Sequence, residues 1–281
     1  MKTYRIAGIT FGIHFHYDEY LKHNIEAYAS DEQKMDHVLS VQLSDIIEHP
    51  RGETQSIRNP YVMYQENKRI IYIKDKNQQI KSLIKHDMAY QHVNIMINPS
   101  LNKNAAEIEY TWLGLMFMEI AIKHKLLPMH AAAINDHGHA ILVSAPSQTG
   151  KSTHARLWKM MDDKVEILND DKPLIGLKDG RMMVFSSPFS GKTSLNQNMD
   201  IPLKALVFLY QGKENMASLM ERDDIIKEMM KNMMRPSDEA SWDDILGIIE
   251  EMIEKLPIYK FEATPKVEAA YYLKKIIDKG E

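Results

Sequence analysis

The chain has 281 residues, of which 44% are hydrophobic and 26% are charged, a composition typical of one large or two ordinary globular domains. Its formal net charge of −4 provides no basic excess for neutralising a nucleic-acid backbone, which argues against nucleic acid as a partner. The sequence contains no cysteine, which excludes disulfides, thiolate nucleophiles and cysteine-bound zinc and fits a reducing compartment.

The first twenty residues, MKTYRIAGITFGIHFHYDEY, contain an apolar stretch that histidine and aspartate interrupt. It is too short and too polar for a signal sequence or a membrane span, so we predict a cytoplasmic protein with no membrane partner. The alternation from Tyr4 to Phe15 predicts one or two strands, whereas Asp18 to Ala29 fits either a short helix or a loop.

Four short alternating runs follow the turn-rich segment RGETQSIRNP, and they are typical of an antiparallel meander. These runs are YVMYQ, RIIYIKD, QQIKSLI and HVNIMIN. We therefore expect residues 1–100 to form a β-rich N-terminal domain.

A long helix is predicted from Ala105 to Leu127, because apolar residues cover a wide helical face that ends just before Pro128. Beyond it, MHAAAI and HAILVS predict two strands of a hairpin joined by the turn NDHG. Further helices are predicted at 152–161, 223–234, 241–256 and 265–279, and strands at 165–168, 172–177, 182–186, KALVFLYQG and IYKFEA. Residues 101–281 are thus expected to form a mixed α/β domain.

The run from Ala145 to Ser152, APSQTGKS, lies between a predicted buried strand and a predicted helix. It matches the phosphate-binding loop with Ala145 in place of the first glycine. In such a loop, backbone N–H groups surround the phosphates, a glycine lets the chain approach them, a lysine reaches the terminal phosphates and a hydroxyl binds Mg²⁺. Gly150, Lys151 and Ser152 are predicted to fill these roles, and the alternative is an ordinary polar turn. The residues expected to contact the nucleotide are Ser147, Gln148, Thr149, Gly150, Lys151, Ser152 and Thr153.

Two adjacent carboxylates, Asp170 and Asp171, end the predicted strand that begins at Val165. The carboxyl ends of strands in an open α/β sheet face the ligand, so both side chains are expected to reach a transferred phosphoryl group. One carboxylate can hold Mg²⁺, while the other, raised in pKa by its neighbour's charge, accepts a proton from an attacking hydroxyl. The alternative is a solvated Asn-Asp-Asp turn. Lys172 either keeps the pair of acids ionised or only continues the chain beyond the end of the strand.

Together, MHAAAINDHGHAILVSAPSQTGKSTHA and ILNDDKPLI resemble the catalytic core of the HPr kinase/phosphorylase family, whose fold is similar to that of phosphoenolpyruvate carboxykinase. The resemblance covers residues 128–210 and implies a mixed sheet carrying a P-loop. It also implies that His130, on the strand before the loop, shares one site with the loop and the two acids. Asp170 is then expected near the metal with Ser152, and Asp171 is expected to be the base that activates a serine hydroxyl.

The chain also departs from that family. Its loop begins with Ala145 instead of glycine, and we recognise neither a segment for gripping HPr nor a similar N-terminal region, so HPr is not the expected substrate. The segment SSPFSGKTSLNQN resembles a divergent branch, some members of which phosphorylate a serine of a precursor peptide. Lys192 in this segment is predicted to bind a phosphate or the acceptor, and the alternative is an incidental surface lysine.

We therefore predict a phosphotransferase that uses Mg²⁺ and ATP or GTP and places the γ-phosphoryl group on a hydroxyl, with serine of a peptide or small protein as the leading acceptor. Its catalytic residues would be Lys151, His130, Asp170 and Asp171, with Ser152 and Asp170 as metal ligands. Two other interpretations remain open. One is a nucleotide-binding sensor or scaffold without transfer activity, and the other is a small-molecule kinase or, with least support, a carboxykinase-type enzyme. Members of the family are often oligomeric, so a homo-oligomer is also an open expectation.

Overall fold

The computed structural model describes residues 1–281 except 57, 147–148, 191–195 and 280–281. The chain divides into two compact units, Met1–Phe117 and Met118–Glu281, and the division falls inside helix α2 (Ala105–Lys123). Each unit contains helices and a sheet with both parallel and antiparallel neighbours. The predicted mixed α/β class is therefore confirmed at this level. Among the described helices, none combines the length and the apolar content that crossing a bilayer requires.

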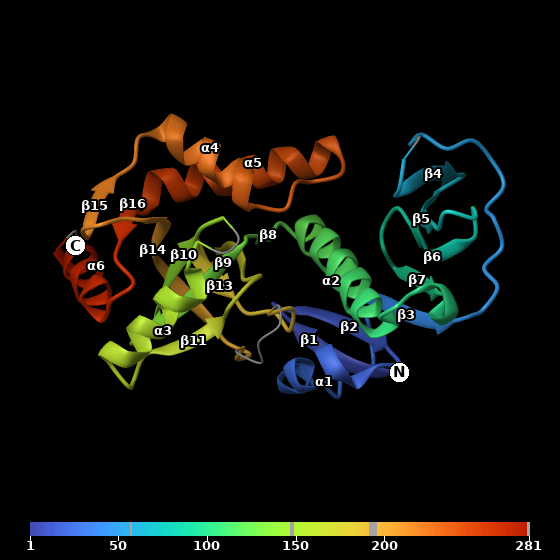
Figure 1. Ribbon diagram of the computed structural model, residues 1–281, viewed down its shortest axis with the longest axis horizontal. Coiled ribbons are helices and arrows are strands. Elements are labelled where there is room, and N and C mark those ends of the chain that lie inside the picture. The colour runs from blue at the N-terminus through green and yellow to red at the C-terminus, as the bar shows by residue number, and fades with distance from the viewer. Residues whose placement is uncertain (57, 147–148, 191–195, 280–281) are drawn as a thin grey trace. The chain divides into compact units, whose positions relative to one another are not determined.

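The first unit is built on a seven-stranded sheet (Figure 1). Its strands are β1 (Lys2–Ile6), β2 (Ile9–His14), β3 (His37–Leu43), β4 (Tyr61–Gln65), β5 (Lys68–Lys74), β6 (Ile80–Asp87) and β7 (His92–Ile97). They lie in the order β1-β2-β3-β7-β6-β5-β4, and β3 is parallel to both of its neighbours. The antiparallel meander is confirmed in β4 to β7, while β3 was not predicted.

Short helices complete this unit. They are α1 (Asp18–Ile25) and the 3₁₀ turns η1 (Glu26–Tyr28) and η2 (Pro99–Leu101), so the segment that fitted either a helix or a loop is helical. Helix α2 packs on the sheet, because the Phe117 ring lies 5.3 Å from that of Phe11 and the indole N–H of Trp112 donates to Ser82 at 3.0 Å.

Helix α2 ends at Lys123, earlier than the predicted Leu127, and this prediction was wrong for a local reason. Lys125 has a φ of 58°, and the N–H of Leu126 donates to the carbonyl of Ala121 at 3.0 Å. A residue in the left-handed region with this hydrogen bond closes a helix. Leu127–Pro128 instead forms the short strand β8.

The second unit contains a nine-stranded sheet. Its other strands are β9 (Ala131–Asp136), β10 (His139–Ser144), β11 (Glu166–Asn169), β12 (Leu174–Lys178), β13 (Arg181–Phe185), β14 (Asp200–Gln211), β15 (Met216–Leu219) and β16 (Ile258–Ala263). The order is β11-β9-β10-β14-β13-β12-β8, and β14 also pairs with β16, which pairs with β15. The predicted β9–β10 hairpin is confirmed, whereas β10, β14 and β16 are parallel neighbours far apart in the sequence.

Helices cover both faces of this sheet. They are α3 (Lys151–Met161), α4 (Arg222–Asn232), α5 (Glu239–Lys255) and α6 (Val267–Lys279), with α4 and α5 on one side and α3 and α6 on the other (Figure 1). In β10, Ala140 and Leu142 pack with the first pair while Ile141 and Val143 pack with the second. Burial on both faces explains why the sequence of this strand is a continuous apolar run.

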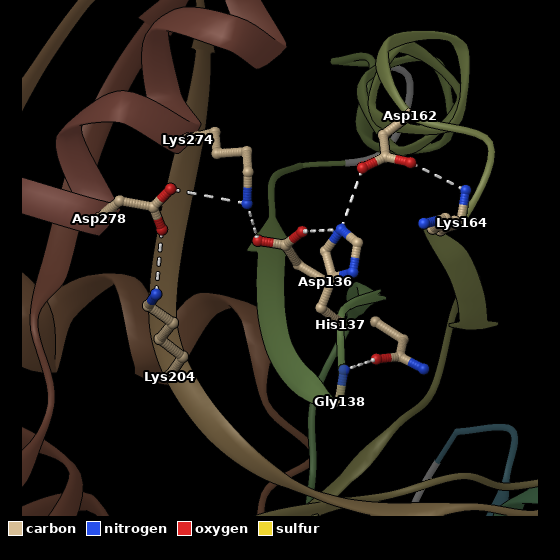
Figure 2. A network of polar contacts seen from close by, with 9 residues as sticks. Asp136, His137, Gly138, Asp162, Lys164, Lys204, Lys274 and Asp278 are labelled. Atoms are coloured by element: carbon tan, nitrogen blue, oxygen red, sulfur yellow. Dashed lines mark hydrogen bonds and ion pairs between the residues drawn. The ribbon is translucent and has the colours of Figure 1, made fainter.

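A polar network anchors the turn of the β9–β10 hairpin to two helices (Figure 2). The ring nitrogen Nε2 of His137 lies 2.9 Å from the carboxylate of Asp162, at the end of α3, and 3.8 Å from that of Asp136. Asp136 also pairs with Lys274 on α6, which lies 3.6 Å from Asp278. The backbone N–H of residue 164 and the His137 ring lower the pKa of Asp162. These contacts hold one end of the hairpin in place.

Trp158 on α3 is expected to be a major contributor to stability. Its side chain is fully buried, with 0% exposed, and its indole N–H donates to Nε2 of His154 at 3.1 Å. Replacing a buried tryptophan with alanine removes apolar contacts and leaves a cavity, so Trp158→Ala should lower the free energy of unfolding by about 3–5 kcal/mol in a urea titration. Met160→Ala on the same helix is the control, because Met160 is 72% exposed and should change stability by less than about 0.5 kcal/mol. Equal losses in the two variants would contradict this packing.

Candidate functional site

The predicted phosphate-binding loop joins β10 to α3, and the structure describes part of it. Gly150 is the N-cap of α3 and has a φ of 115°, in the region that favours glycine. Among the described residues, nothing lies within 4 Å of a β-carbon built at this position, so the positive φ is the reason for glycine that the structure shows. The carbonyl of Gly150 accepts the N–H of His154 at 2.8 Å, which begins the helix. Three residues predicted for the site lie outside the described residues, namely Ser147, Gln148 and Lys192.

Three of the predicted catalytic side chains meet at the start of α3. The ammonium of Lys151 lies 2.9 Å from Nε2 of His130, and the same nitrogen lies 3.3 Å from a carboxylate oxygen of Asp171. His130 stands between β8 and β9, and its backbone N–H donates to the backbone carbonyl of Asn232 at 2.7 Å. The loop lysine, the histidine and the second acid therefore form one chain of contacts.

The two contacts of His130 require different states of its ring. Nε2 can accept from the Lys151 ammonium only when it carries no hydrogen, and it can donate to Asp171 only when it carries one. Because one nitrogen cannot do both at once, the partner of His130 depends on where the ring holds its proton. The His130 ring can thus form its hydrogen bond with either the Lys151 ammonium or the Asp171 carboxylate, since both lie close to the same nitrogen.

Asp171 is held in its ionised form. Burial acts to raise its pKa, but the hydrogen bond from His130 and the charge of Lys172 outweigh burial, so the pKa of this carboxyl lies below its usual value. The Lys172 ammonium is 3.5 Å from Asp171, which favours the prediction that this lysine keeps the acid ionised. In contrast, burial lowers the pKa of Lys151, although the charge of Asp171 opposes that effect.

Asp170 behaves differently from its neighbour. Only 5% of it is exposed, and burial raises its pKa even though a hydrogen bond from Ser152 and the charges of Lys151 and Arg156 oppose the shift. The expectation that a neighbour's charge would raise the pKa of the proton-accepting acid was wrong. The pKa of Asp171, the predicted base, is lowered, and the raised pKa is that of Asp170, the predicted metal ligand, with burial as the largest cause and the charge of Asp171 as a minor one.

Ser152 and Asp170 fit the requirements of a magnesium ion. The Ser152 side chain is hydrogen-bonded to Asp170, and the oxygen Oδ1 of Asp170 is buried with no hydrogen-bond partner among the described residues. Mg²⁺ prefers oxygen ligands and is commonly held by one or two protein groups together with phosphates and water. The part of the chain that the structure describes contains no group of three or more His, Asp or Glu that could hold a metal ion.

A pocket of about 400 Å³ lies beside the start of α3, and sequence reasoning did not predict it. Burial lowers the pKa of His154 in its wall to about 4, so this ring is neutral near pH 7. The pocket is lined by Thr149, Gly150, Thr153, His154, Leu157, Leu209, Tyr210, Gln211, Gly212, Ala263, Thr264 and Pro265. It therefore joins three residues predicted to contact the nucleotide to the carboxyl ends of the parallel strands β14 and β16.

The site also contains residues that sequence reasoning missed. Asn169 and Ser187 are both fully buried and are hydrogen-bonded to each other and to the turn that carries the acids. Arg156, one helical turn after Ser152, adds a positive charge that acts on Asp170. The asparagine before the two acids is the signal that the sequence offers, but an Asn-Asp-Asp run is equally typical of a turn.

Comparisons with known proteins do not assign the chain to a family. No family model matches the chain, and no curated protein matches it. Among solved structures, it is similar to the HPr(Ser) kinase/phosphatase from Coxiella burnetii, with a TM-score of 0.34 and 11% sequence identity. That match covers 54% of this chain and 89% of the other. A similarity this distant assigns neither a family nor an activity, so the function has to be inferred from the chemistry of the site.

Proposed function

We propose that this protein is a kinase that transfers the γ-phosphoryl group of ATP or GTP to a hydroxyl group, with serine of a peptide or small protein as the leading acceptor. The observation that carries the proposal is the meeting of Lys151, His130 and Asp171 at the start of α3. A P-loop lysine next to an ionised carboxylate is an arrangement suited to phosphoryl transfer, in which positioning and charge supply most of the catalysis.

Each described group has a role in this reaction. Lys151 and the backbone N–H groups at the start of α3 would bind the β- and γ-phosphates. Ser152 and Asp170 would hold Mg²⁺, which neutralises phosphate charge when it is bound. Asp171 would accept the proton of the acceptor hydroxyl while that oxygen attacks the γ-phosphorus, and the nucleoside diphosphate would leave. Lys172 and His130 support this role, since both keep Asp171 ionised.

The pocket beside α3 supports a nucleotide over an isolated phosphate. It begins at Thr149 and Gly150 in the loop and extends past the apolar side chains of Leu157, Leu209 and Ala263. Its volume of about 400 Å³ is within the range typical of small-molecule sites. We assign this pocket to the base and ribose, with the phosphates at the start of the helix.

Label transfer from [γ-³²P]ATP tests the proposed activity. The full chain would be incubated with Mg-ATP or Mg-GTP and with pools of serine peptides, small proteins and small hydroxyl compounds, and the products would be separated. Label in a peptide or protein acceptor supports the proposal, while label only in a small molecule would assign a small-molecule kinase. Tight retention of nucleotide with no labelled acceptor would instead identify a sensor or scaffold.

Gly150→Ala is expected to weaken ATP binding about tenfold, because an L-residue in the left-handed region costs about 1–2 kcal/mol. Binding would be measured by isothermal titration and stability by thermal unfolding. Gly180→Ala is the matched control, since Gly180 has a φ of 74° in the β12–β13 turn and equally open space around it. Both variants should lose stability, but only Gly150→Ala should lose affinity. Equal ATP affinities in the two variants would show that this loop does not bind phosphate.

A further inference from the structure

Asn169 uses both ends of its side-chain amide within the site. It is the last residue of β11, and none of it is exposed. Its oxygen Oδ1 accepts the backbone N–H of Asp171 at 2.9 Å and that of Lys172 at 2.7 Å. One buried oxygen therefore fixes the direction in which the chain turns after the strand, and with it the backbone of the predicted base.

The other end of the amide reaches a different segment. Nδ2 of Asn169 donates to the carbonyl of Ser187 at 2.8 Å and lies 3.3 Å from the Ser187 hydroxyl. That hydroxyl in turn donates to the carbonyl of Lys172 at 2.7 Å. The hydrogen bonds thus form a closed ring through Asn169, Ser187 and Lys172, and both side chains are wholly buried.

The pairing of β11 with β9 is irregular at the end of β11 that carries Asn169. The register between β11 and β9 shifts between Ile167 and Asn169, so Asn169 pairs with Ala133 after an irregularity. A bulge next to a site redirects the side chains that follow it. Here the residues that follow are Asp170 and Asp171, which point to Ser152 and to His130 respectively.

We propose that Asn169 and Ser187 are positioning residues, a buried clamp that holds the turn carrying Asp170 and Asp171 at the reacting distance from the bound phosphates. The inference rests on the proposed function, because it assigns a role within phosphoryl transfer. Both side chains are wholly buried, so neither is expected to touch the substrate. The clamp acts through the backbone of residues 171 and 172, and a displacement of about 1 Å in a reacting group can cost on the order of 10²-fold in rate.

Asn169→Ala tests the clamp against a purely structural role. The rate of label transfer at saturating Mg-ATP should fall by about 10²-fold, while the Kd of a fluorescent ATP analogue stays at the wild-type value, because Lys151 and the helix start are unchanged. Asn169→Ser should recover part of the rate, since a serine hydroxyl can accept from the same backbone N–H groups. Ser187→Ala should lie between wild type and Asn169→Ala, and it carries the test if Asn169→Ala does not fold.

Asn135→Ala is the matched control. Asn135 is also a buried asparagine whose Oδ1 accepts a backbone N–H, that of Gly138, but it stands at the β9–β10 turn. The Asn135→Ala substitution should lower the unfolding temperature and leave the transfer rate unchanged. A transfer rate in Asn169→Ala equal to that of the control, or no recovery in Asn169→Ser, would overturn the clamp alone. A wild-type protein that labels no acceptor would overturn the proposed function, and the clamp with it.

Discussion

Asp171→Asn is expected to lower the rate of phosphoryl transfer by about 10²–10⁴-fold, the usual contribution of a positioned general base. An asparagine of the same shape cannot accept the proton of the attacking hydroxyl. ATP affinity should stay close to the wild-type value, because the hydrogen bond of the Lys151 ammonium is made to His130 and not to Asp171, and asparagine keeps the shape of the replaced side chain. Single-turnover transfer and equilibrium binding of ATP would measure the two quantities separately.

The matched control for this variant is Asp163→Asn. Asp163 is exposed and lies beyond the last residue of α3, whereas Lys151 is the first. The Asp163→Asn change removes the same charge at the other end of the helix from the site. Transfer should be unaffected in the control. If Asp171→Asn transferred phosphate as fast as Asp163→Asn, another group would have to be the base.

Lys151→Ala should damage both binding and transfer. Hydrogen bonds from a charged donor contribute about 1.5–3 kcal/mol, so ATP affinity is expected to fall by about 10- to 100-fold, with a further loss in the transfer rate. Folding should not suffer. Burial lowers the pKa of Lys151, which means that the folded state disfavours its charged form, and removing that charge relieves this cost near pH 7.

Isothermal titration with ATP and thermal unfolding would check both parts of this prediction. Lys159→Ala is the control, since Lys159 is an exposed lysine on the same helix. Wild-type ATP affinity in Lys151→Ala would show that the ammonium does not reach the phosphates. A large drop in its unfolding temperature would show that the contact with His130 is mainly structural.

Much of the fold could be predicted from local patterns, and two of the strands that were not predicted share one cause. Hairpins such as β9–β10 are signalled by a turn between two apolar runs, and α3 by the glycine that precedes it. Strand β3 lacks such a signal, because its partners β2 and β7 are parallel to it and no turn joins it to either. Strand β15 is only four residues long and is defined by its pairing with β16. Both were missed because their partners lie elsewhere in the chain.

The site divides in the same way. Lys151, Asp170 and Asp171 were identified because a linear motif places them, and the structure brings Lys151 and Asp171 to a shared histidine. Burial of Asp170, which decides the direction of its pKa shift, depends on packing that no local pattern reveals. The pocket beside α3 is likewise formed by the ends of strands far apart in the sequence, and the contact between Asn169 and Ser187 is equally non-local.

The parallel pairing at the centre of the second sheet has a consequence for how the protein is made. Val143 on the strand that leads into the loop lies opposite Val207, and Val207 lies opposite Tyr259. Bringing such distant strands together costs chain entropy before any hydrogen bond between them forms, which makes this type of sheet slow to assemble. A nascent chain therefore cannot complete the sheet beside its predicted phosphate-binding loop until the residues up to Ala263 have left the ribosome. Until then the apolar strand β10 is exposed and must not aggregate.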